Sequence, residues 1–334
     1  METQTIFNDI ASKLSLGNIT SPVKKLAGGF AHEVFSLETD KGKYAIKLLN
    51  PETMSHQYAM DILATAEQLE KKLQDNGIPI VPSLEFNGTK MQCIDGRYFY
   101  VFDFIDGKAL ATQDIQKEHC EIIGSVLANI HKIEHDADSF ERYEINIDWD
   151  SYIQTATDKN SEIAELLKDN REILYKAQMD SNSAYKAISN RVVISNGDMD
   201  SKNVLWANGK PHIIDLEYLS YANPYAELFQ LALCWSGCEH YAIDYELLTV
   251  FIESYVKEYG AIEEDWEVLY KSNAGSRLEW LEMNVRKALA LDCGNEDERN
   301  IGIERAKDAM KYTIYYSHVK DELLRELRGR IKSL

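Results

Sequence analysis

Apolar and polar positions alternate over the first third of the chain in the way that is typical of strands. The expected strands are 33–37, 44–49, 83–87 and 97–105. A polar turn at 39–42 predicts that the first two form a hairpin. Over 55–76 the apolar residues recur instead at helical spacing, until Gly77 and Pro79 end the pattern. The pattern therefore predicts a small sheet accompanied by one helix.

After the Asp106–Gly107 interruption, helical periodicity dominates the chain. The expected helices are 120–131, 163–178, 225–235, 247–259 and 303–331, and the expected short strands among them are 192–194, 204–206 and 212–216. The stretch 294–300 is expected to be a charged loop. The sequence thus predicts an α+β protein with two lobes: residues 1–103, with a small antiparallel sheet and a helix, and residues 104–334, mostly helical.

Length and net charge limit the number of lobes and the kinds of partner that the chain is expected to have. A chain of 334 residues is longer than one hydrophobic core usually serves, which agrees with two lobes. The net charge is −19, from 36 Lys and Arg against 55 Asp and Glu, so nucleic acid would be repelled and is not expected as a partner. A negatively charged cleft would concentrate a cationic small molecule, although the same charge also simply keeps a protein soluble.

Location follows from two further features of the sequence. No apolar run reaches the roughly 18 to 20 residues that cross a bilayer, and the first residues lack a basic region followed by an apolar one. The 5 cysteines are scattered without a Cys-x-x-Cys spacing, which argues against a disulfide framework and a zinc site. A cytoplasmic protein without a membrane partner is expected, as a monomer or a homodimer.

The segment 196–205, Asn-Gly-Asp-Met-Asp-Ser-Lys-Asn-Val-Leu, carries the most informative chemistry. It places Asp198 and Asn203 on one loop, and Asp215 then follows at the end of an apolar run. In phosphoryl transfer, one Asp orients the acceptor hydroxyl and takes its proton, while an Asn oxygen and a second carboxylate hold magnesium on the nucleotide phosphates. The three residues are therefore candidates for these roles.

This segment resembles the catalytic loop of the aminoglycoside phosphotransferase and choline kinase superfamily, His-Gly-Asp-x-x-x-x-Asn-x-Leu, and the later Ile-Asp-x-Glu pattern matches at 214–217. The resemblance implies a bilobal protein-kinase-like fold with Asp198 as the catalytic base. It also implies Asn203 and Asp215 as magnesium ligands. Glu217 would be a nearby supporting carboxylate. The family's His is replaced by Asn196, whose amide can still shape the loop through hydrogen bonds.

Two further positions are interpreted through the same resemblance. Residues 223–228, Asn-Pro-Tyr-Ala-Glu-Leu, are similar to the family's Asp-Pro-x-x-Asp-Leu, which puts Glu227 in the place of an acid that supports the catalytic loop. The alternative is an exposed Glu in the first turn of a helix. His131, at the end of an apolar helix, is expected to be a packed helix residue rather than a second base.

Upstream, Gly28 and Gly29 are expected to form a turn between strands that covers the nucleotide, because glycine lets backbone N–H groups approach phosphates. A plain hairpin turn is the alternative. Lys47 lies in an apolar strand, where it would neutralise the α- and β-phosphates and would need a carboxylate partner. By resemblance to the family's spacing between a helix glutamate and the following proline, Glu67 is the expected partner, and Glu70 is the second choice. No Gly-x-x-x-x-Gly-Lys-Ser/Thr motif is present, which disfavours a P-loop kinase.

The remaining binding groups are expected at the end of the sheet and in the helical lobe. Backbone groups near Phe102 and Phe104 would bind adenine. Carboxylates and aromatic faces bind ammonium groups, so acidic and aromatic residues of the second lobe are candidates for acceptor recognition. These candidates, with one amide among them, are Asp200, Trp235, Glu239, Trp280, Glu282 and Asn284.

The expected function is transfer of the γ-phosphate of ATP, or of GTP, to a hydroxyl of a small, cationic molecule, with Mg²⁺. An aminoglycoside or related aminocyclitol is the first expectation for the acceptor. Choline or ethanolamine is the second, since Asp-Leu-Glu-Tyr at 215–218 also resembles choline kinases, and a sugar stays open. A catalytically dead nucleotide-binding or regulatory protein is the alternative of another class, motivated by Asn196 and by a glycine turn without a hydroxyl.

Overall fold

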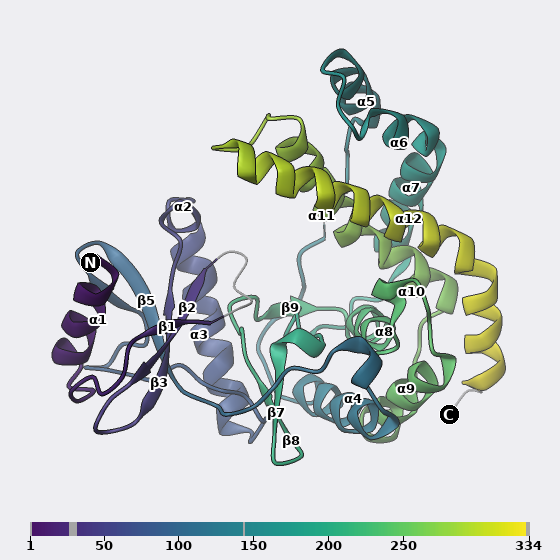
Figure 1. Cartoon of the computed structure of the whole chain (residues 1–334). Helices are drawn as coiled ribbons and strands as arrows, with labels where there is room; N and C mark the ends of the chain where they lie inside the picture. The colour runs from purple at the N-terminus through teal and green to yellow at the C-terminus, as the bar shows by residue number, and fades with distance from the viewer. Residues whose placement is uncertain (1, 27–31, 143, 332–334) are drawn as a thin grey trace. The chain divides into compact units, whose positions relative to one another are not determined.

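A computed structural model describes residues 2–26, 32–142 and 144–331 of the chain (Figure 1). Contacts divide the chain into two compact units, and each is described by itself. The first comprises Met1–Leu110 and Asn196–Ser220, and the second comprises Ala111–Ser195 and Tyr221–Leu334. The segment with Asp198 and Asp215 thus groups with the N-terminal residues, while a division into functional lobes at residues 103 and 104 stays a prediction.

The first unit is a mixed α+β structure around one antiparallel sheet with the strand order β1-β2-β3-β5-β4. Its elements are α1 (Glu2–Lys13), β1 (Lys24–Lys25), β2 (Glu33–Glu38), β3 (Lys43–Leu48), α2 (Pro51–Met54), α3 (Ala59–Asp75), β4 (Gln92–Ile94), β5 (Arg97–Asp103), the 3₁₀ helix η2 (Ser201–Asn203), β7 (Val204–Ala207) and β8 (Lys210–Ile213). The expected sheet with a helix is confirmed.

Each face of this sheet has its own core. On one face, apolar residues of α1 such as Phe7 and Ile10 pack against Ile46 and Val101 of the strands. Lys47 belongs to the opposite face, because successive strand residues alternate between faces. There it pairs across the strands with Tyr100, which packs with α3. The alternation in β3 thus directs one cation to the α3 side of the sheet.

The expected strand at 83–87 does not form. Asn87 and Gly88 adopt positive φ values of 53° and 82°, and Phe86 and Thr89 exchange two backbone hydrogen bonds across them. Asn87 and Gly88 thus form a tight turn, because such turns require φ > 0 at both central residues. The turn reverses the chain before residues 83–87 can form a strand. The sheet takes its last strand instead from β4, which alternation did not reveal.

The second unit is mostly helical, as expected. Its elements are η1 (Thr112–Asp114), α4 (Lys117–His131), α5 (Trp149–Asp158), α6 (Ala164–Asp169), α7 (Arg171–Ala187), β6 (Val193–Ser195), β9 (Ser220–Ala222, which begins at the unit boundary), α8 (Pro224–Trp235), η3 (Cys238–His240), α9 (Tyr245–Tyr259), α10 (Trp266–Ser272), α11 (Ala274–Ala288) and α12 (Glu296–Arg330). Gly124 of α4 lets α9 approach closely, because a Cβ there would lie 2.5 Å from the carbonyl oxygen of Phe251.

The expected charged loop at 294–300 is largely the first turn of α12. Asn295 caps this helix by accepting a hydrogen bond from the backbone N–H of Glu298 at 2.9 Å. The acidic side chains that suggested a loop suit a helix N-terminus, where the helix dipole favours negative charge. None of the helices in the described ranges is long and apolar enough to span a membrane.

Candidate active site

The loop after β6 holds the expected base in a defined orientation. The amide Nδ2 of Asn203 donates to the backbone oxygen of Asp198 and to its Oδ2, both at 2.8 Å. The other carboxylate oxygen, Oδ1, lies 3.4 Å from Nζ of Lys202. Asn196 accepts a hydrogen bond of 3.3 Å from the Asp198 backbone N–H, so this amide shapes the loop as expected. Asn203 therefore fixes one oxygen of Asp198, and the other accepts a long hydrogen bond from the ammonium of Lys202.

Burial gives the Asp198 carboxyl an unusual proton affinity. It raises the pKa of Asp198 to about 6, and the charge of Lys202 works against that rise. The nearby carboxylates of Asp200 and Asp215 contribute to this rise, since like charges disfavour ionisation. A carboxylate of this kind remains ionised at neutral pH and takes up a proton more readily than an exposed Asp.

Asn203 and Asp215 are brought together by the β7–β8 hairpin. The backbone N–H of Ile214 donates to the carbonyl of Asn203 at 2.9 Å, so the two candidate metal ligands lie at the same end of the hairpin. Asp215 itself adopts φ 63°, in the left-handed region that residues other than glycine rarely enter. Strain of this kind persists where the surroundings determine the conformation, and it is common at functional sites.

Lys47 meets two carboxylates of the segment after β8. Its Nζ lies 2.7 Å from Oδ1 of Asp215 and also contacts Oε1 of Glu217. Burial alone would lower the pKa of Lys47, but Glu217 and Asp215 raise it above the usual value. The lysine is therefore a buried cation held ready beside the candidate metal ligands.

The expected ion pair between Lys47 and Glu67 is not formed among the described residues. Glu67 of α3 instead accepts a hydrogen bond of 2.8 Å from the hydroxyl of Tyr100, the cross-strand neighbour of Lys47. Glu70, the second choice, accepts hydrogen bonds from Ser83 and pairs with Lys90. The helix thus places Glu67 on the correct face, but its carboxylate binds the tyrosine hydroxyl rather than the lysine.

A residue that the sequence did not single out, His32, also contacts this group. Its Nε2 lies 3.3 Å from Oε2 of Glu217, and its Nδ1 accepts a hydrogen bond of 2.9 Å from the backbone N–H of Asn50. Burial would raise the pKa of Glu217, but the hydrogen bond from His32 and the charge of Lys47 hold it below the usual value. In the sequence, the only signal for a role of His32 at the site was its place directly after the glycine turn.

The candidate ligands fit a magnesium ion. Because Asn203 turns its Nδ2 toward Asp198, its Oδ1 is the atom left to bind a cation. The carboxylate of Asp215 is partly exposed and supplies a second oxygen. Hard oxygen ligands of this kind, completed by phosphate oxygens and water, are what magnesium prefers.

The expected nucleotide contacts are placed only in part. Gly28 and Gly29 lie outside the described residues. Phe102 lies in β5 and is partly exposed, and Phe104 follows the strand, with its backbone N–H donating to the carbonyl of Lys43 at 3.1 Å. The ammonium of Lys43 also lies 3.7 Å from the centre of the Phe104 ring. Adenine binding near these residues stays a prediction.

Two side chains of the first unit could meet an acceptor near Asp198. Asp200 caps η2 through the backbone N–H of Lys202 and forms an ion pair of 2.7 Å with its Nζ. Tyr218, which the sequence analysis did not assign to the acceptor, is 57% exposed. Partial burial raises the pKa of its hydroxyl, as do the charges of Glu217, Asp215 and Asp198. An exposed aromatic ring thus lies within the field of these carboxylates.

The other acceptor candidates belong to the second unit, and the described structure gives each a partner. Glu239 is paired with Arg277, and Glu282 accepts a hydrogen bond of 2.7 Å from the hydroxyl of Tyr152. Trp280 is 40% exposed, with the guanidinium of Arg305 5.7 Å from its ring. Of the further candidates, Trp235 and Asn284 are fully buried, which fits packing better than ligand contact.

Glu227 is buried rather than exposed, which removes the alternative of an exposed first-turn residue. Its Oε2 lies 3.0 Å from Nε2 of His131, whose Nδ1 is 2.8 Å from the hydroxyl of Tyr255. His131 is thus a packed helix residue with both ring nitrogens engaged inside the second unit. Support of the catalytic loop by Glu227 stays a prediction.

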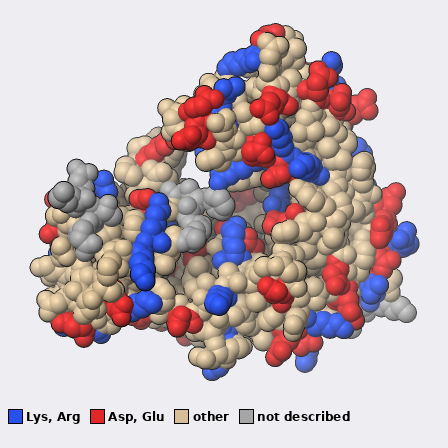
Figure 2. All heavy atoms as spheres, viewed as in Figure 1, with Lys and Arg blue, Asp and Glu red and all other residues tan. Residues whose placement is uncertain are grey.

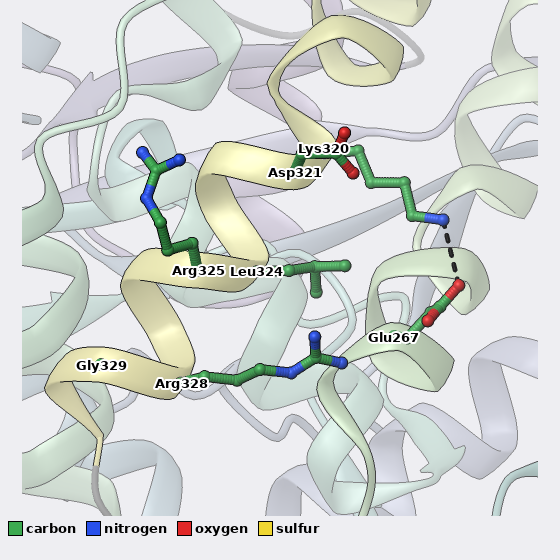
Figure 3. Close-up of a pocket in the computed structure, with 7 residues that line it drawn as sticks. All are labelled: Glu267, Lys320, Asp321, Leu324, Arg325, Arg328 and Gly329. Atoms are coloured by element: carbon green, nitrogen blue, oxygen red, sulfur yellow. Dashed lines mark hydrogen bonds and ion pairs between the residues drawn. The ribbon is translucent and has the colours of Figure 1, made fainter.

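An open hollow of about 700 Å³ lies beside the C-terminal half of α12 (Figure 3). It is lined by Glu267, Lys320, Asp321, Leu324, Arg325, Arg328 and Gly329, and Lys320 reaches Glu267 at 3.0 Å. None of the expected site residues lines it.

Figure 2 shows acidic and basic side chains interspersed over the face in view rather than gathered in patches of one sign.

Comparison with known proteins adds the family. The model of a family described as "Phosphotransferase enzyme family" (APH) matches residues 22–270, well over half of the chain. The chain belongs to this family. It is accordingly a phosphotransferase enzyme, and its α+β architecture is the protein-kinase-like fold. No protein with a curated description matches the sequence.

Solved structures agree on the fold of this phosphotransferase. Spectinomycin phosphotransferase APH(9)-Ia, in complex with ADP and spectinomycin, has a TM-score of 0.71 at 15% identity, over 93% of this chain and 98% of that one. Amicoumacin kinase hAmiN, in complex with AMP-PNP, Ca²⁺ and "Ami", has a TM-score of 0.59 at 12% identity, over 93% and 94%. An ethanolamine kinase of Plasmodium vivax has a TM-score of 0.58 at 17% identity, over 89% and 83%. At such identities the likeness shows the fold alone.

Proposed function

We propose that this phosphotransferase moves the γ-phosphate of Mg²⁺-bound ATP to a hydroxyl of a small, cationic molecule. The observation that carries the proposal is the convergence of Asp198, Asn203, Asp215 and Lys47 within the first unit. These residues supply, in one place, a base, two oxygen ligands and a cation for the phosphates, which are the parts that phosphoryl transfer requires.

Each group has a defined task in this proposal. Oδ1 of Asp198 accepts the proton of the acceptor hydroxyl as its oxygen forms a bond to the γ-phosphorus and ADP leaves. Oδ2 stays hydrogen-bonded to Asn203, which keeps the carboxylate oriented. Lys47 offsets phosphate charge, and Asn203 and Asp215 would hold magnesium. When bound, magnesium would neutralise charge on the phosphates.

Charge and aromatic character support a cationic acceptor. The carboxylates of Asp198, Asp200 and Asp215 lie close enough to influence one pKa, and the exposed ring of Tyr218 lies in the same field. An aromatic face beside carboxylates suits an ammonium group. An aminoglycoside-type acceptor is proposed first, and the related spectinomycin phosphotransferase shares the fold. A choline- or ethanolamine-type acceptor is the second candidate, because Tyr218 would suit a compact ammonium ion.

The proposed setting is the cytoplasm, where ATP and magnesium are abundant and the five free cysteines would remain reduced. The first unit alone supplies the proposed base, metal ligands and phosphate-binding lysine. The reaction is therefore compatible with a monomer or a homodimer. GTP remains the alternative nucleotide.

A panel of acceptors with γ-labelled ATP tests the proposal. Aminoglycosides, aminocyclitols, choline, ethanolamine and neutral sugars are compared, with Asp198→Asn as the inactive control. Labelled product should appear with a cationic acceptor and vanish in the variant, whose affinity for ATP should stay nearly unchanged. A protein that binds ATP with Mg²⁺ but never turns it over would support the catalytically dead alternative.

A further inference from the structure

His32 connects two parts of the first unit that are distant in sequence. The residue is 8% exposed and lies immediately before β2. Because Nδ1 accepts a hydrogen bond from the backbone N–H of Asn50, the proton of the neutral ring must be on Nε2. That N–H faces Oε2 of Glu217 at 3.3 Å. The backbone at the end of β3 therefore selects the tautomer that can donate to Glu217.

Glu217 links His32 to Lys47. One of its oxygens faces His32, and the other contacts Nζ of Lys47. The Glu217 side chain is 13% exposed and that of Lys47 is 10% exposed, so both charges are largely removed from water. A buried pair depends on good geometry, because an ill-placed partner leaves an uncompensated charge.

Lys47 needs an anchor that is not a metal ligand. In the structure it is shared between Asp215 and Glu217. A metal ion on Asp215 would compete with the lysine for that carboxylate. The helix carboxylate that usually serves such a lysine is not its partner here, because Glu67 accepts a hydrogen bond from Tyr100 and forms no ion pair with Lys47 among the described residues. Glu217 is thus the carboxylate left to hold Lys47 during the reaction.

We propose that His32 is a positioning residue for phosphoryl transfer: it holds Glu217 against Lys47 and so keeps the lysine directed at the nucleotide phosphates. The inference rests on the proposed function and adds a residue to it. His32 touches neither the nucleotide nor the acceptor in this role. Partners that orient a primary group in this way typically change activity or affinity by about 10- to 100-fold when they are removed.

Three substitutions separate this role from a structural one. His32→Gln can place an N–H donor near the position of Nε2 but loses the acceptor for Asn50. His32→Asn can place an acceptor near the position of Nδ1 but cannot reach Glu217, and His32→Ala loses both contacts. His56→Gln, at an exposed histidine of the same unit, is the matched control.

The measurements are Mg²⁺-dependent ATP hydrolysis, binding of a fluorescent ATP analogue, and thermal unfolding. His32→Gln should stay within about 3-fold of the wild type in kcat/KM for ATP, while His32→Asn and His32→Ala should lose about 10- to 100-fold. His56→Gln should change nothing. In a Glu217→Gln background, replacing His32 should cost little more, because its effect passes through that carboxylate.

Two results would overturn the inference: wild-type kinetics for all His32 variants, or retention by His32→Asn with loss in His32→Gln. The second pattern would mean that the histidine serves only the backbone at Asn50. If His32→Ala does not fold, the Gln and Asn pair decides alone. A wild-type protein that neither binds nor hydrolyses ATP would overturn the proposed function itself, which distinguishes the two failures.

Discussion

Lys47 and Asp215, which lie 168 positions apart in the chain, form an ion pair with Nζ and Oδ1 2.7 Å apart. The lysine comes from a strand of the sheet, and the aspartate comes from the segment directly after β8. Backbone bonds between Ile213 and the segment at Pro79 and Val81 attach the hairpin to this unit. The ion pair thus joins Lys47, the proposed partner of the phosphates, to Asp215, a proposed metal ligand.

Removal of the Lys47 cation should impair use of the nucleotide. Lys47→Ala should lower kcat/KM for ATP by about 10²- to 10³-fold, the usual scale for losing one well-placed electrostatic contact. Binding of a fluorescent ATP analogue should weaken as well, because the lysine would neutralise phosphate charge in the ground state. Lys71→Ala, at an exposed lysine of α3, is the matched control. Unchanged ATP dependence in Lys47→Ala would contradict the assigned role.

Asp198 should titrate far above the range that is usual for aspartate. Burial raises its pKa to about 6, so in the nucleotide-free protein the carboxyl should be mostly ionised at pH 7 and mostly protonated at pH 5. Carboxyl-carbon NMR of labelled aspartates, with Asp198→Asn used for assignment, measures this directly. Below its pKa the group already carries a proton and cannot accept one from the acceptor. A midpoint below pH 4 would show that the carboxyl is better solvated than the structure indicates.

Tyr218 should discriminate cationic from neutral acceptors. Tyr218→Ala should raise KM for a cationic acceptor by about 2- to 30-fold, which corresponds to a cation–π contact of about 0.5–2 kcal/mol. Tyr218→Phe keeps the ring and should stay close to the wild type. A neutral sugar acceptor, if used at all, should show no such dependence. Equal effects on charged and neutral acceptors would assign the ring to general packing.

The pair of His131 and Glu227 should matter for stability. His131→Ala would remove the hydrogen bond between the imidazole and the buried Glu227, at a cost of about 1–3 kcal/mol in the free energy of unfolding. Glu227→Gln keeps an oxygen that can accept from the histidine and removes the charge, so it should cost less. Chemical denaturation of the two variants gives the comparison. A smaller loss for His131→Ala than for Glu227→Gln would contradict this account.

Periodicity predicted most of the elements that position the site. The hairpin of β2 and β3, the long helix α3 and the strand β5 all follow from apolar spacing, because each presents one face to a core. Periodicity failed where a turn decided the outcome, as at Asn87 and Gly88. It also failed for α1, whose apolar face was not recognised in the sequence.

The sequence by itself determined the local chemistry. Asp198 and Asn203 share one short loop, so their spacing alone indicated that they could act together, and the hydrogen bonds between them agree. Turns at glycines and helical patterns are likewise set by residues that are adjacent in the chain. Local features of this kind can be predicted because short segments have few conformations to choose from.

Only the tertiary structure decided which carboxylate holds Lys47. A helical pattern shows that Glu67 faces the sheet, but not that its carboxylate binds the hydroxyl of Tyr100 instead of Lys47. Glu217 reaches the lysine from a distant part of the sequence, and His32 in turn contacts Glu217. The partner of a buried charge depends on which groups are packed around it in three dimensions, and residue spacing along the chain does not contain that information.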